Sequence, residues 1–238
     1  MTQQQIKRFY KEVDIERTAE GIEVRLDGRS LRTPMRAHLR LPTERLAREV
    51  AAEWADQTET VDLSSMPITG FANTALDRVA PRRDEVIDEL TGYAETDLLC
   101  YRADEPAELV ERQEGTWQPQ LDWLEDTHGA RLVATSGIVH VAQDEAALAI
   151  IRGVVSARDE FSLTGLHVLT TGTGSVVLGL AVADGALDAA GAAAAGHLDE
   201  LFQSELWGED VEATARRKQI GRELASAETF LGLLLAES

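Results

Sequence analysis

Histidine and carboxylate side chains are the groups in this sequence that could carry acid–base chemistry or hold a metal. The five histidines are scattered with no two at ligand spacing and no Cys/His cluster beside them, so a structural zinc site is not expected. His197 lies close to Asp199 and Glu200 and could act as a base, but an exposed histidine at a helix end is the favoured interpretation. The pairs Asp199-Glu200 and Glu209-Asp210 carry no specific hydrolase signal, and a solvated helix face is the favoured interpretation of them. We therefore predict no catalytic residue, no metal and no cofactor.

Phosphate-binding and thiol chemistry are not indicated either. Residues 172–177 (Gly-Thr-Gly-Ser-Val-Val) nearly match a dinucleotide-binding fingerprint, but Val177 stands where the fingerprint needs Gly or Ala. No Gly-Lys-Ser/Thr occurs, which excludes a P-loop ATPase. Cys100 lies in an apolar context and is predicted to be a small core residue, not a nucleophile.

Residues 197–212 combine acidic, apolar and aromatic side chains in a pattern that suits holding another protein. Helical spacing places four apolar residues on one face, and Trp207-Gly208 is predicted to end the helix. From Asp199 to Glu212 the chain has six acids and no Lys or Arg. Trp207 is interpreted equally well as a core residue or as an interface anchor, whereas core packing is favoured for Trp54. The four apolar residues are Leu198, Leu201, Phe202 and Leu206.

Charge and composition exclude several classes of function. The 238 residues carry 23 basic and 42 acidic side chains, a net charge of −19, although residues 1–50 hold 11 basic and 8 acidic ones. Most of the surface should therefore repel nucleic acid and anionic membranes. No apolar run is long enough to span a membrane, and the N-terminus has neither a signal core nor a convincing transit peptide. A single cysteine fits a reducing compartment, and we predict a cytoplasmic protein.

The elements that must position these residues form two domains. Residues 1–62 are predicted to be an α+β domain: short strands over 7–15, 22–26, 30–33 and 38–41, with Asp27-Gly28 as a hairpin turn. Thr43 is predicted to cap an amphipathic helix over residues 43–57 that buries Trp54. Residues 58–67 are polar, irregular and end in proline, so we expect the domain boundary there.

Residues 63–238 are predicted to form a larger, mainly helical domain. Asp84, Pro106 and Pro119 suit helix starts, and helices are expected over 143–159 and along 220–234. Residues 175–182 have strand propensity when considered alone, and residues 129–141 are left open between a short strand and an ordered loop.

An ordered set of short strings runs over roughly residues 7 to 235, and each string is weak alone although the set is specific. The strings are Lys7-Arg8-Phe9-Tyr10, Leu26-Asp27-Gly28-Arg29, Leu31-Arg32-Thr33-Pro34, Glu53-Trp54, Met66-Pro67, Asn73-Thr74-Ala75-Leu76-Asp77, Asp97-Leu98-Leu99-Cys100-Tyr101-Arg102, Glu105-Pro106, Gln113, Trp117, Trp123, Leu198-Asp199-Glu200-Leu201-Phe202-Gln203 and Trp207-Gly208. In this order they resemble the family of assembly chaperones for the alpha subunit of F1-ATPase, whose mitochondrial member is ATP synthase F1 assembly factor 2.

The resemblance implies a chaperone without enzymatic activity that binds newly made alpha subunit and releases it to the beta subunit. It also implies a bacterial, cytoplasmic and monomeric member, whose eukaryotic relatives act in the mitochondrial matrix, and it favours a helix over residues 175–182. Two other hypotheses are a hydrolase-like enzyme that uses acidic residues in an interdomain cleft, and a generic acidic adaptor protein. An exposed apolar patch beside residues 199–212 would favour the chaperone.

The site residues that we predict fall into two groups. Residues expected to bind the protein client are Asp199, Glu200, Phe202, Gln203, Trp207, Glu209 and Asp210. Residues expected to have a structural or interdomain role are Trp54, Asp97 and Arg102.

Overall fold

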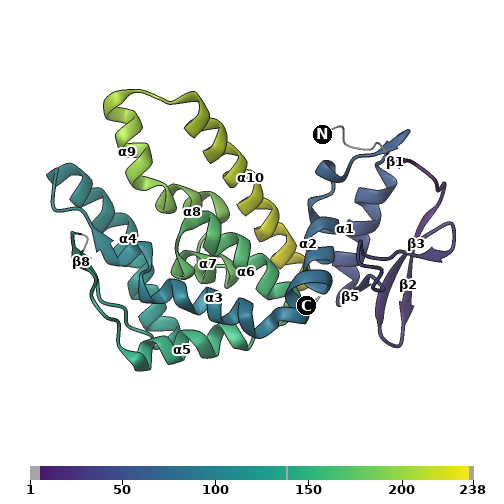
Figure 1. The fold of residues 1–238 in the computed structure, drawn as a ribbon, viewed down its shortest axis with the longest axis horizontal. Coiled ribbons are helices and arrows are strands. Elements are labelled where there is room, and N and C mark those ends of the chain that lie inside the picture. Colours follow the sequence, from purple (N-terminus) through teal and green to yellow (C-terminus); the bar gives the residue numbers. More distant parts are fainter. Residues whose placement is uncertain (1–5, 138, 236–238) are drawn as a thin grey trace. The chain divides into compact units, whose positions relative to one another are not determined.

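The computed structural model describes residues 6–137 and 139–235, and its internal contacts divide the chain into two units. The first unit comprises residues up to Arg82 together with those from Thr229 onward, and the second comprises residues 83–228. Short strands and helices build the first unit, and helices dominate the second (Figure 1). The predicted α+β class, with a small antiparallel sheet followed by a larger helical part, is confirmed.

The first unit contains a sheet centred on one buried strand, Gly21–Leu26 (β3), which pairs antiparallel with three others. Its alternating apolar residues are buried, as the sequence predicts. Asp27 and Gly28, with φ of 49° and 75°, form the predicted hairpin turn, because both tolerate the left-handed conformation that this turn needs. The predicted strand over 7–15 is instead split in two. The strands of this unit are β1 (Ile6–Lys7), β2 (Val13–Thr18), β3, β4 (Arg29–Ser30), β5 (Arg40–Leu41) and β6 (Thr60–Val61).

The helix α1 (Glu44–Ala55) begins as predicted. The Thr43 hydroxyl accepts a hydrogen bond from the amide of Leu46, which satisfies a donor that the helix itself leaves free. Leu46, Val50 and Trp54 are buried along one face. The predicted capping residue and buried stripe are confirmed.

The division between the units differs from the predicted boundary after residue 62, because the following segment is bonded to α1. The buried carboxylate of Glu53 accepts hydrogen bonds from the amides of Ile68 and Thr69, each at 2.7 Å, and Gln57 accepts one from the amide of Asp62. These bonds hold the next helix within the first unit, and whether residues 1–62 fold alone stays a prediction. The segment consists of the 3₁₀ turn η1 (Leu63–Ser65), α2 (Pro67–Thr74), the π-helical turn η2 (Ala75–Val79) and the 3₁₀ turn η3 (Ala80–Arg82).

The second unit is built around α7 (Val176–Ala183), which packs against helices from four other segments (Figure 1). Its residues 176–182 are all buried, and Ser175 caps it by accepting from the amide of Leu178. The strand that these residues alone suggested is wrong, and the helix implied by the resemblance is confirmed. The neighbouring elements are α3 (Arg83–Glu95), η4 (Leu98–Cys100), β7 (Tyr101–Arg102), α4 (Ala107–His128), β8 (Thr135–Ser136), α5 (Glu145–Ser156), α6 (Glu160–Thr173), α8 (Ala189–Gly196), α9 (Leu198–Trp207) and α10 (Val211–Leu234).

Two of the predicted helix starts are not found at the predicted residues. Asp84 does not cap α3, because that helix follows η3 directly and begins at Arg83. Pro119 does not start a helix and lies inside α4, whose buried stripe continues on both sides of it. Between α4 and α5, the described residues form only the two-residue strand β8, which pairs in parallel with β7, and otherwise an irregular segment.

Candidate protein-binding site

The corner between α9 and α10 exposes large apolar side chains. Gly208, with φ of 93°, ends α9, and α10 begins three residues later at Val211 (Figure 1). Leu206 is 56% exposed, Trp207 78% and Val211 83%. A cluster of this kind costs free energy in water and is typical of a surface that binds another protein. These exposed apolar residues lie within residues 199–212 themselves, and such a surface is what a chaperone needs.

The predicted apolar face of α9 is only partly buried. Leu198 and Phe202 point into the unit, whereas Leu201 and Leu206 are exposed on the flanks of that stripe. The guanidinium of Arg112 lies over the Phe202 ring at 5.1 Å from its centroid. Phe202 thus fixes α9 to α4 and is not available as a surface contact.

Glu200 connects α9 to α10. Its carboxylate accepts hydrogen bonds from Arg217 at 2.8 Å and Arg216 at 3.0 Å. Partial burial alone would raise the pKa of Glu200, but the two guanidinium groups hold it below its ordinary value. The predicted client-binding carboxylate therefore also serves to hold the α9–α10 corner together.

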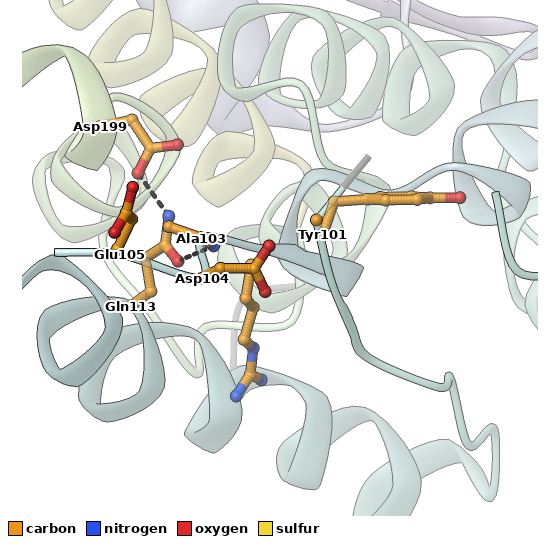
Figure 2. Close-up of a pocket in the computed structure, with 8 residues that line it drawn as sticks. Tyr101, Ala103, Asp104, Glu105, Gln113 and Asp199 are labelled. Atoms are coloured by element: carbon orange, nitrogen blue, oxygen red, sulfur yellow. Dashed lines mark hydrogen bonds between the residues drawn. The ribbon is translucent and has the colours of Figure 1, made fainter. Parts of the chain in front are cut away.

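Asp199 borders a cavity of about 480 Å³ in the second unit (Figure 2). The buried amide of Gln113 donates to Asp199 at 2.6 Å and accepts from the backbone amide of Ala103 at 2.8 Å, so it ties α9 to the chain after β7. Figure 2 shows both bonds converging on Gln113. The cavity is lined by Tyr101, Arg102, Ala103, Asp104, Glu105, Gln113, Gly137 and Asp199.

The remaining predicted binding residues lie on the surface near the corner. Gln203 and Glu209 are exposed and form no hydrogen bond or ion pair within the part of the chain that the structure describes. Asp210 is exposed too, but its carboxylate accepts from the amide of Ala213 and caps α10. Glu205, which the prediction did not include, pairs with Arg112 at 2.7 Å.

The residues predicted to be structural are largely buried, and their described contacts lie within their own units. The Trp54 carbonyl accepts from the Tyr10 hydroxyl at 2.6 Å. Asp97 is fully buried and accepts from the amides of Leu99 and Val177, and burial raises its pKa to about 6. Arg102 forms an ion pair with Glu114 and donates a hydrogen bond to Gln118, both on α4. Their interdomain role stays a prediction.

Among the described residues, no group of three His, Cys, Asp or Glu is arranged to hold a metal. Burial raises the pKa of Cys100 to about 12, so its thiol stays protonated and unreactive, as predicted. No helix among residues 6–137 and 139–235 combines the length and apolar character needed to cross a bilayer.

Comparison with known proteins agrees with this architecture and with the resemblance. A family described as ATP12 chaperone protein matches residues 7–125. The crystal structure of Atp12 from Paracoccus denitrificans superposes with a TM-score of 0.95 at 43% identity, covering 97% of this chain and 99% of that one. A protein from Agrobacterium tumefaciens superposes with a TM-score of 0.91 at 38% identity, covering 96% of this chain and 86% of that one. The mitochondrial protein atp12 of Schizosaccharomyces pombe is 26% identical over 220 residues, which cover 87% of this chain and 76% of the relative. The chain therefore belongs to the ATP12 chaperone family.

Proposed function

We propose that this protein is a molecular chaperone of ATP synthase assembly that binds the newly made alpha subunit of F1-ATPase. It masks an apolar interface of that subunit and releases it when the beta subunit takes its place. Membership of the ATP12 chaperone family supports a chaperone role. The exposed apolar cluster at the α9–α10 corner is the observation that supports this corner as the client-binding surface.

The physical chemistry of the chain suits this role. Before assembly, the apolar interface of the client is not yet covered by its final partner. The exposed side chains of Leu206, Trp207 and Val211 can cover it during that time. A net charge of −19 keeps a complex with an aggregation-prone client in solution. The affinity for the client has to be moderate, because the beta subunit must be able to displace the chaperone.

We assign the predicted binding residues to two roles. Trp207, Gln203, Glu209 and Asp210 contact the client, because they are exposed on or beside α9. A second group acts indirectly by holding α9 in place through α4 and α10: Asp199, Glu200 and Phe202.

The test is to mix the purified protein with the F1 alpha subunit of the same organism without nucleotide and to follow the mixture by size-exclusion chromatography. A co-eluting complex that dissociates when beta subunit is added supports the proposal. Absence of a complex, with both proteins folded by circular dichroism, would refute it. A variant with Trp207→Ala should elute separately from alpha subunit, and one with Val139→Ala, an exposed apolar residue elsewhere in the second unit, should co-elute.

The proposal includes a cytoplasmic, monomeric protein without enzymatic activity that binds neither nucleic acid nor membrane. The net charge opposes the last two partners. Trp54, Asp97 and Arg102 have structural roles, and their loss is expected to act through stability.

A further inference from the structure

The charges around the α9–α10 corner are not balanced. The side chains of Glu209 and Glu212 form no hydrogen bond or ion pair within the described residues, and they lie on either side of Val211 in the sequence, after Trp207. Three arginines of α4 and α10 are already paired, because Arg216 and Arg217 bind Glu200, and Arg112 binds Glu108 and Glu205.

An exposed indole followed in the chain by two unpaired carboxylates favours one kind of ligand. The face of a tryptophan ring attracts Lys and Arg side chains, and carboxylates nearby strengthen that attraction. The neighbouring Leu206 and Val211 offer apolar contacts on the same corner. An acidic segment would be repelled, and an uncharged apolar one would leave the carboxylates unused.

We propose that the corner formed by Leu206, Trp207, Glu209, Val211 and Glu212 docks a cationic amphipathic segment of the client. A Lys or Arg side chain of that segment lies on the Trp207 ring, within reach of Glu209 and Glu212, and its apolar side chains cover Leu206 and Val211. This inference deepens the proposed function and rests on it for the identity of the client. The chemistry of the segment follows from the corner itself.

The inference can be tested with two synthetic peptides of equal length and identical apolar positions. One peptide carries Lys and the other carries Glu at the remaining positions, and binding is followed by fluorescence anisotropy of an attached dye. The Lys peptide should bind saturably and more weakly as salt rises, and the Glu peptide should not bind. Trp54 and Trp117 are buried and Trp123 is half-buried, so a blue shift of the protein's emission that disappears in the Trp207→Phe variant would report that Trp207 becomes covered. Equal binding of both peptides would overturn the inference.

Matched variants separate the corner from the general negative charge of the chain. Replacing Glu209 and Glu212 by Gln should weaken the Lys peptide roughly tenfold. The control replaces Asp126 by Asn and Glu145 by Gln, which are exposed and unpaired within the described residues and lose the same charge. Trp207→Leu should weaken binding more than Trp207→Phe, which keeps an aromatic face. If the corner and control variants bind alike, the corner is not the site.

The same variants with the F1 alpha subunit distinguish failure of this inference from failure of the proposed function. Capture of alpha subunit that is unchanged by the substitutions at Trp207, Glu209 and Glu212 would overturn the inference while leaving the chaperone role intact. Binding of the Lys peptide at the corner without any capture of alpha subunit would support the inference and refute the proposed client.

Discussion

Replacing Glu200 by Lys should separate α9 from the beginning of α10. Glu200 accepts from both Arg216 and Arg217, and the side chain of Arg217 is only 11% exposed, so that pair lies at the strong end of surface ion pairs. Loss of the two contacts costs about 1–2 kcal/mol, and placing a third cation beside the arginines adds about 1 kcal/mol. We expect the free energy of unfolding to fall by about 2–3 kcal/mol in total.

Urea unfolding followed by circular dichroism measures this change. The control is Glu111→Lys, which makes the same charge change on an exposed residue of α4 that has no ion pair in the described chain and should cost less than about 0.5 kcal/mol. Combining Glu200→Lys with Arg217→Glu should recover part of the loss. A Glu200→Lys protein as stable as its parent would contradict the idea that Glu200 holds the corner, and would leave direct client contact as its role.

Three further predictions concern buried groups. Glu53→Gln should lower the free energy of unfolding by about 1–3 kcal/mol in urea melts, because an amide group would face one of the two backbone amides that start α2. Burial raises the pKa of Asp97 from 3.8 to about 6, so its contribution to stability is greatest below pH 4 and is lost as pH rises through 6. The stability of Asp97→Asn relative to the parent should accordingly rise by about 3 kcal/mol between pH 4 and pH 7, and a pH-independent difference would contradict this. Gly179→Ala should cost about 1–3 kcal/mol, since its Cβ would lie 2.6 Å from Oγ1 of Thr170, whereas Gly115→Ala, with open space around it, should be neutral or stabilising in thermal melts.

Local signals in the sequence predicted the elements that they control directly. The Asp27-Gly28 turn and the Thr43 cap depend on a few adjacent residues, and both form as expected. The helix α7 could not be predicted from its own residues, because it is buried on all sides and shows no polar face, so its Val-rich run looks like a strand. Pro119 suggested a helix start, but Trp117 and Leu121 pack on either side of it and hold α4 together through the proline.

Only those parts of the candidate site that depend on neighbouring residues in the chain could be predicted from the sequence. The end of α9 at Gly208 follows from a local signal, and the acidic stretch after it is visible in the sequence. The partners of Glu200 come from α10, and Arg112 contacts α9 from a position ~90 residues earlier in the chain. Such contacts form only when the chain folds, so no local pattern could predict them. No spacing within α9 could show that its apolar residues divide into a buried stripe and an exposed corner.

The central claim is that this protein prevents aggregation of the F1 alpha subunit, and light scattering tests it most directly. The alpha subunit is diluted from denaturant into buffer that contains increasing amounts of this protein. The account predicts that aggregation is suppressed in proportion to added protein up to a one-to-one complex, and that the Trp207→Ala variant suppresses it less. Suppression no greater than that produced by an unrelated protein of similar net charge would contradict the account.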